Sequence, residues 1–127
     1  MLESKEGKQV VYAKNRAEWR EWLRANSQFE KSVWLILQHK KSKIQGINLN
    51  DATEEALCFG WIDSISNKRD TESTYQRFSP RKANSNWSPS NIERVERLAA
   101  AGLMTEHGQK LIDLAKQQGR WNVEKEK

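Results

Sequence analysis

A run of twelve residues, RFSPRKANSNWS at 77–88, carries cations and aromatic rings but no carboxylate. Arg77, Arg81 and Lys82 alternate there with aromatic residues, among them Trp87. Charge of one sign concentrated in one segment raises the local concentration of ions of the opposite sign. The residue types therefore predict a place that receives a small anion or a phosphorylated ligand, with an ordinary solvated loop as the alternative.

A second segment of the chain has the same bias. No Asp or Glu occurs between Lys31 and Asn50, where there are four lysines, and none occurs between Ser73 and Ile92, where there are three cations. The two segments thus contain seven of the 22 basic residues and none of the 17 acidic ones, in a chain of net charge +5. Segregated charge builds a field at one place on a surface, so we expect a basic surface there.

Two short segments, WIDSIS and STYQRF, predict a pair of strands joined by the polar turn NKRDTE. Alternation with a period of two places Trp61 and Asp63 on one face of the first strand, and Tyr75 and Arg77 on one face of the second. If Asp63 lies opposite Arg77, the ion pair either fixes the strand register or holds the guanidinium so that its free edge meets a ligand. Both interpretations are open.

The basic loop that follows Arg77 leads into a predicted helix, which Ser88 caps and Pro89 begins. The first turn of a helix exposes unpaired amides and the positive end of the helix dipole, where anions bind. Trp87 either roofs such a pocket or forms a hydrophobic staple with the helix. The candidate ligand-binding residues are Trp61, Asp63, Tyr75, Arg77, Arg81, Lys82, Asn86, Trp87 and Ser88.

Motifs for catalysis and metal binding are missing from the sequence. Cys58, the single cysteine, falls in an apolar stretch, where a thiol is usually inert, and His39 and His107 belong to distant elements. There is no Gly-rich phosphate loop, nucleophile elbow or HExxH motif. We therefore predict no catalytic residue, no metal and no cofactor, and a binding protein rather than an enzyme.

The composition also bears on the compartment. A single cysteine fits a reducing compartment, and the opening MLESKEGK is too polar and acidic for a signal peptide. No run of apolar residues reaches the length of a membrane helix. We expect a cytoplasmic protein with no membrane span, whose oligomeric state the sequence leaves open.

The pattern of elements predicts one α+β domain over residues 1–127, with residues 1–8 and 122–127 frayed. Six Trp and two Tyr can bury large surfaces in a chain that has few aliphatic residues. We expect a small sheet of three to four strands packed with about four helices. The expected strands are 9–13, 32–39, 61–66 and 73–78, with 32–39 central, and the expected helices begin at the caps Asn15, Asn48, Ser88 and Thr105.

An ordered series of blocks in this sequence resembles the YdeI/OmpD-associated family, also called bacteriocin-protection proteins. The blocks are EALCFGWIDS at 55–64, QRFSPRK at 76–82, SNWS at 85–88, NIERVERL at 91–98 and GLMTEHG at 102–108, and the resemblance covers residues 15–121. It implies a small bacterial cytosolic protein linked to envelope stress and to protection from antibacterial peptides. It implies no known reaction and no catalytic residues.

Two other functions fit the same residues. Basic segments at 40–43 and 77–82 interleaved with aromatic rings are the ingredients of a nucleic-acid-binding module, because cations contact phosphates while rings stack on bases. A module that binds acidic or membrane-derived protein partners in an envelope stress response is the third possibility. The modest net charge and the absence of a known reader motif make nucleic acid the weaker alternative to a small anionic ligand.

Overall fold

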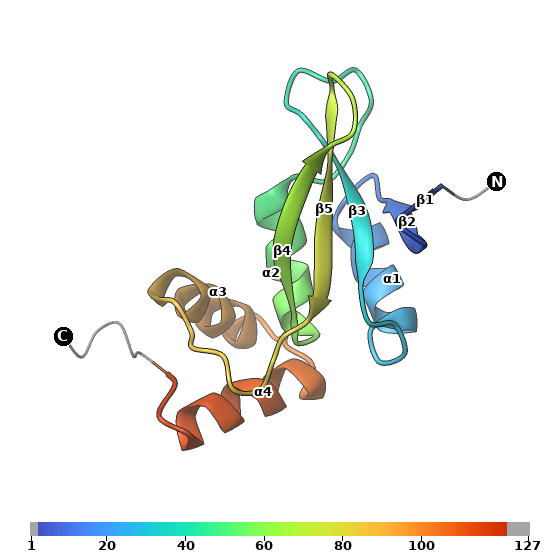
Figure 1. Ribbon diagram of the computed structural model, residues 1–127. Helices are drawn as coiled ribbons and strands as arrows, with labels where there is room; N and C mark the ends of the chain where they lie inside the picture. Colours follow the sequence, from blue (N-terminus) through green and yellow to red (C-terminus); the bar gives the residue numbers. More distant parts are fainter. Residues whose placement is uncertain (1–2, 122–127) are drawn as a thin grey trace.

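The computed structural model describes residues 3–121, and these form a mixed α+β domain with four helices and a five-stranded sheet (Figure 1). The predicted class and number of helices are confirmed, whereas the sheet has more strands than the three to four expected. In chain order the elements are β1 Ser4–Lys5, β2 Lys8–Tyr12, α1 Arg16–Asn26, β3 Val33–Gln38, α2 Leu49–Cys58, β4 Trp61–Lys68, β5 Ser73–Pro80, α3 Pro89–Ala100 and α4 Glu106–Gln117.

The additional strand is β1, which forms a tight antiparallel hairpin with β2 through Glu6 and Gly7, both at positive φ. Two paired residues carry too little sequence pattern to predict a strand. Of the terminal segments that we expected to be frayed, residues 1–2 and 122–127 lie outside the described residues, while Ser4 pairs with Gln9.

The strand order in the sheet is β1-β2-β3-β5-β4. β2 and β3 are parallel and are connected by α1, as a parallel pair requires, while β3 pairs with β5, and β5 with β4, in the antiparallel sense. Residues 33–37 of β3 are all buried, which explains their continuous apolar run. The prediction that this strand is central is confirmed.

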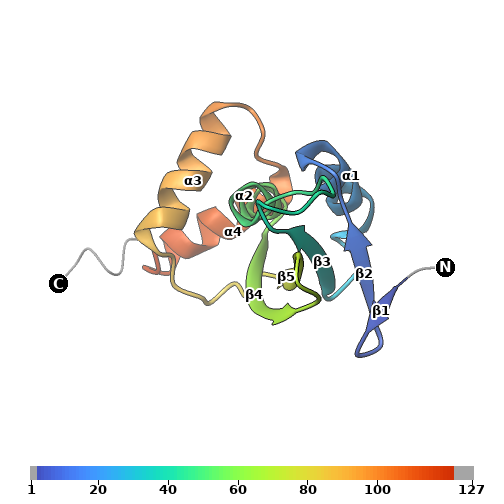
Figure 2. The ribbon, with the colours of Figure 1, turned by 90° about the horizontal axis from the view of Figure 1, so that it is seen from above.

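Two helices, α1 and α2, cover one face of the sheet (Figure 2). The apolar stripe of α1 brings Trp19 and Leu23 against β3 and β5, and both are fully buried. The buried indole N–H of Trp19 is satisfied, because Nε1 donates to the carbonyl of Ala52 at 3.0 Å. Trp61 Nε1 likewise donates to the carbonyl of Ser27 at 3.0 Å, which ties the start of β4 to the end of α1.

The other two helices, α3 and α4, pack around α2 beside the β4 edge of the sheet (Figures 1 and 2). The predicted caps Ser88 and Thr105 accept from the amides of Asn91 and Gly108, respectively. Gly108 lies so close to the end of α2 that an added Cβ would stand 2.6 Å from the carbonyl oxygen of Cys58. α2 is therefore the centre of the helical layer.

The register between β4 and β5 differs from the one that we considered from the sequence. Asp63 lies opposite Phe78, not Arg77, and the proposed Asp63–Arg77 pair is wrong. The strands extend into the residues that we expected to form the turn, so that Asn67 pairs with Tyr75. An irregularity between Asp63 and Ser66 then changes the offset between the two strands by one residue. A shift of one residue changes every cross-strand partner, and Arg77 lies beside Trp34 of β3.

Candidate functional site

The two basic segments of the sequence lie at opposite ends of the sheet. Residues 39–43 follow the end of β3, next to the beginning of β5, whereas residues 81–88 follow the end of β5. Eight residues of β5 separate the two ends, which corresponds to about 23 Å at the usual rise of a strand. Residues 39–43 therefore do not share a surface with residues 81–88. Lys31, at the start of the first acid-free segment, lies at the same end of the sheet as Arg81 and lines the same hollow.

Arg81 lines a hollow near the end of β5, which is the lower end of that strand in Figure 1. We call this hollow the end hollow. It has a volume of about 450 Å³, within the range of small-molecule sites. Its walls come from residues 27–31 after α1, residues 59–61 at the start of β4, Pro80 and Arg81 at the end of β5, and a partly exposed side of α4. Segments from both ends of the chain thus meet here.

The half-buried guanidinium of Arg81 is held in place by the loop that follows it. It stacks on the ring of Trp87 at 3.9 Å, and Nη2 donates to the carbonyl of Asn86 at 2.6 Å. Its Nε is buried and has no hydrogen-bond partner among the described residues. Burial lowers the pKa of Arg81, because the charged form is desolvated and no ion pair from residues 3–121 offsets that cost.

A second arginine is fixed by the same asparagine. Arg120 Nη1 donates to the side-chain oxygen of Asn86 at 3.2 Å, and the carbonyl of Arg120 accepts from the amide of Trp87. The Nε of Arg120 is also buried without a partner in the described part of the chain. Asn86 therefore positions two arginines through two different oxygens. Each guanidinium group still has an N–H donor, its Nε, without a partner among the described residues.

The remaining walls of the end hollow combine cations with apolar surface. Lys31 and Lys110 are exposed at its rim, together with one acid, Glu30. Phe29, on the loop after α1, is 82% exposed, an unusual position for a large ring. α4 contributes three more side chains to the wall, namely those of His107, Leu111 and Leu114.

Of the other residues predicted for the site, some lie at or near the end hollow and others lie elsewhere in the fold. Trp61 lines the end hollow, and Trp87 is buried in one cluster with Ile92, four positions after its helix cap, so it acts as a hydrophobic staple. Lys82 is exposed on the loop. Ser88 caps α3 and is not among the residues that line the end hollow.

Three predicted residues lie elsewhere. Arg77 lines a second hollow with residues 7–9 and 29–32, which we call the Arg77 hollow. Tyr75 is on the sheet face away from the helices, and its hydroxyl donates to Glu3. Asp63 lines a polar hollow together with Ser90, Asn91 and Arg94 of α3, away from the end hollow.

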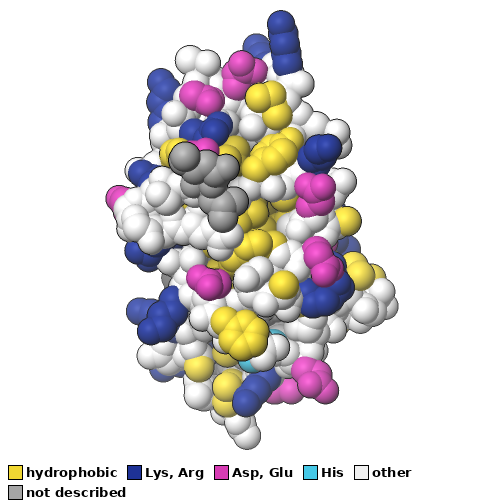
Figure 3. Space-filling model, turned by 90° about the vertical axis from the view of Figure 1, so that its right-hand side faces the viewer, with side chains coloured by type: hydrophobic (Ala, Val, Ile, Leu, Met, Phe, Trp, Pro, Cys, Tyr) yellow, Lys and Arg dark blue, Asp and Glu magenta, His cyan; other side chains and the backbone are white. Residues whose placement is uncertain are grey.

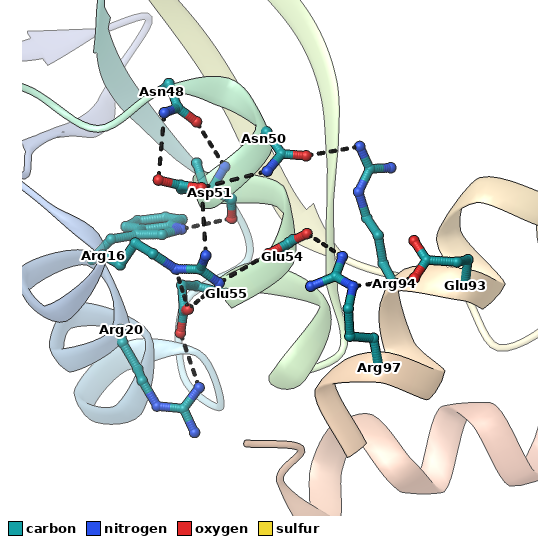
Figure 4. A network of polar contacts seen from close by, with 12 residues as sticks. Arg16, Arg20, Asn48, Asn50, Asp51, Glu54, Glu55, Glu93, Arg94 and Arg97 are labelled. Carbon is teal, nitrogen blue, oxygen red and sulfur yellow. Dashed lines mark hydrogen bonds and ion pairs between the residues drawn. The ribbon is translucent and has the colours of Figure 1, made fainter. Parts of the chain in front are cut away.

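The sequence did not lead us to the junction between α1, α2 and α3. Glu54 and Glu55 of α2 are almost fully buried, at 3% and 4% exposure, and three arginines from the neighbouring helices bind them (Figure 4). Arg16 contacts both carboxylates at 3.1 and 2.7 Å. Two acids within an otherwise apolar helix, ATEEALCF, were the signal that could have indicated a buried ion-pair network.

We call this network the ionic junction; its members are Arg16, Arg20, Asp51, Glu54, Glu55 and Arg97. The pKa of Glu54 is lowered, chiefly because the guanidinium of Arg97 bonds to its carboxylate. Nearby, burial raises the pKa of the Cys58 thiol, which keeps it protonated and unreactive. Every member of the junction has a partner of opposite charge within it, so the junction connects the three helices.

No group of three or more His, Cys, Asp or Glu side chains among residues 3–121 is arranged to hold a metal ion. No helix within this range combines the length and the apolar character that crossing a membrane requires.

The surface seen from the side of β1 and β2 interleaves Lys and Arg with Asp and Glu, and hydrophobic side chains appear between them (Figure 3). A continuous stripe of positive charge, as nucleic-acid-binding proteins often have, is not present on that face.

Comparison with known proteins gives one match. A family model described as a domain of unknown function, DUF8412, matches residues 11–111, from β2 into α4. No curated protein and no solved structure matches the chain.

Proposed function

The chain belongs to the DUF8412 family, and from the geometry of this member we propose that it binds a small organic anion, carboxylate or phosphate, in the end hollow. The observation that carries the proposal is Arg81, a half-buried cation with a buried unpartnered Nε and no carboxylate beside it among residues 3–121. A desolvated cation without a counter-ion is costly, and an anion that enters the hollow would offset that cost.

The charge and shape of the hollow support an organic anion. Lys31 and Lys110 at the rim add two positive charges to that of Arg81, against the single negative charge of Glu30. Apolar side chains cover much of the remaining wall, among them Phe29 and Leu111. A few convergent polar groups in a mostly apolar hollow are typical of a small-molecule site.

Titration with phenyl phosphate tests this function, with calorimetry and a shift of the unfolding temperature as readouts. We expect Arg81→Met and Lys110→Ala to weaken binding at least about tenfold, the loss expected for one charge-assisted hydrogen bond. Lys40→Ala, at the opposite end of the sheet, is the matched control and should bind normally. Equal affinity in all four proteins, or no binding at low salt, would refute the proposal.

Nucleic acid is the alternative from another class. The roughly 23 Å between residues 39–43 and 81–88 and the mixed charge on the face in Figure 3 favour a local anion site over a long phosphate track. An oligonucleotide titrated at two salt concentrations separates the two. A log-log slope near −0.7 per neutralised phosphate, over many phosphates, would indicate single-stranded nucleic acid.

We propose in addition that the protein is related to the YdeI/OmpD-associated family and takes part in protection from antibacterial peptides in the cytoplasm. The ordered blocks from 55–64 to 102–108 support this kinship. Survival of bacteria exposed to such peptides, with the wild type or Arg81→Met as the only copy, tests the link. Equal survival with both proteins would separate the end hollow from any protective role.

A further inference from the structure

Two arginines without an acidic partner among the described residues, Arg77 and Arg81, each line a hollow that the exposed Phe29 also lines. No carboxylate of residues 3–121 forms an ion pair with Arg77, which is half-buried, or with Arg81. The two residues belong to different hollows, of about 560 and 450 Å³. Each hollow therefore has a cation whose charge is not neutralised within it.

The two hollows are contiguous. Phe29, Glu30 and Lys31 line both of them, so a short loop forms the ridge between the hollows. Lys8 adds a further cation on the Arg77 side, and Lys110 adds one on the Arg81 side. Glu30 is the only acid that lines either hollow among the described residues.

The ridge itself is apolar at its top. The ring of Phe29 is 82% exposed, although burying an aromatic ring of this size would be favourable. A ligand that crosses from one hollow to the other has to pass over this ring. The middle of such a ligand would be apolar or aromatic, because only then does it gain free energy by covering Phe29.

We propose that the ligand of the end hollow is bis-anionic: one anionic group binds at Arg81 and Lys110, a second binds at Arg77 and Lys8, and an apolar middle covers Phe29. This inference rests on the proposed function, because it extends the ligand of that site. Arg77 lies near the end of β5 and Arg81 directly follows the strand, so four residues of extended chain place their Cα atoms about 13 Å apart. The spacer between the two anionic groups has to span a comparable distance.

The test uses two bisphosphate esters, one with a short and one with a long alkyl spacer, together with phenyl phosphate. Only the long ester reaches across about 13 Å. Joining two anions should raise affinity at least about tenfold over phenyl phosphate, because the second contact becomes intramolecular. The short ester should bind no better than phenyl phosphate.

Variants assign the two ends of the ligand. Arg77→Ala should reduce the long ester to the affinity of phenyl phosphate and leave phenyl phosphate itself unchanged. Phe29→Ala should weaken the long ester several-fold. Arg24→Ala, which removes an exposed arginine already paired with Glu21, is the matched control and should have no effect.

The outcomes separate this inference from the function on which it rests. If phenyl phosphate binds in an Arg81-dependent way but the long ester gains nothing, or gains equally in Arg77→Ala, the bis-anionic ligand is wrong and the end-hollow site stands. If no phosphate ester binds, or binding ignores Arg81, both proposals fail. Because Arg77 and Phe29 make no described side-chain hydrogen bond, the folding of their variants can be checked simply by thermal unfolding.

Discussion

Arginines in two regions of this molecule differ in one respect, which is whether a carboxylate accompanies them. At the ionic junction, Arg16, Arg20 and Arg97 all contact Glu54 or Glu55. At the end hollow, Arg81 contacts a tryptophan ring and a backbone carbonyl, and no acid of the described residues neutralises it. The same type of side chain is therefore neutralised inside the fold in one place and has no carboxylate partner among residues 3–121 in the other.

The comparison shows why counting cations in a sequence misleads. Arg97 is spaced for an exposed pair with Glu93, and that pair forms at 3.1 Å. The same guanidinium also reaches the buried carboxylate of Glu54, which no spacing along one helix could indicate. What matters is whether the charge is neutralised inside the fold, and variants in the two regions can test that.

The largest effect should come from Glu55→Gln, which removes the charge that Arg16 and Arg20 share. We expect a loss of about 3 kcal/mol in unfolding free energy, the low end for breaking a buried ion pair because both arginines keep access to water. Urea denaturation measures it. Glu21→Gln, which breaks an exposed pair with Arg24, is the control and should change stability by less than about 0.5 kcal/mol. Equal losses of unfolding free energy in the two variants would mean that the ion pairs of the junction stabilise the fold no more than an exposed ion pair does.

Gly108→Ala should follow, with a loss of about 2 kcal/mol, because the new Cβ would be 2.6 Å from a backbone oxygen of α2. The displacement of α4 would also widen the end hollow, so the affinity for phenyl phosphate should fall along with stability. Gln117→Ala, on the exposed side of α4, is the control for both readouts. An unchanged stability in Gly108→Ala would show that the two helices can separate without cost.

Acid should weaken the junction. The folded-state pKa of Glu54 is lowered, so its stabilising contribution is complete above the unfolded value of about 4.3 and disappears as the pH falls through the folded value. Unfolding temperatures measured below about pH 5 should therefore fall less steeply in Glu54→Gln than in the wild type. Parallel curves for the two proteins would contradict this assignment.

The smallest effect on stability should come from Arg81→Met. Methionine keeps an apolar contact with Trp87 and removes a desolvated charge, so the unfolding free energy should change by less than about 0.5 kcal/mol while anion binding is lost. Arg16→Met removes a partner from two buried carboxylates and should destabilise clearly. A reversed order would invert the roles that we assign to the two regions.

The elements of this fold could largely be predicted because local signals specify them. Asn15, Asn48, Ser88 and Thr105 cap the four helices, and their side chains accept the expected backbone amides. The continuous apolar run of β3 indicated its central position. The two-residue strand β1 carries no comparable signal and was missed.

The site was harder to predict, because distant segments assemble it. Arg81 and Trp61 were identified as candidates and line one hollow, but Phe29 and Lys110 were not. Nothing in their local sequence shows that the loop after α1 and the helix α4 line the same hollow. The Asp63–Arg77 pairing failed because a single-residue shift of register, set by the turn and an irregularity in β4, changes every partner.

Residues 27–31 form one part of the wall of the end hollow, and α4, which comes far later in the chain, forms another part. During synthesis, the sheet with its first two helices can assemble before that last wall arrives. Occupancy would then stabilise only molecules in which α4 has docked, and transient detachment of this helix would release whatever is bound. Amide hydrogen exchange along α4 should slow with ligand concentration, which makes this helix a reporter of occupancy.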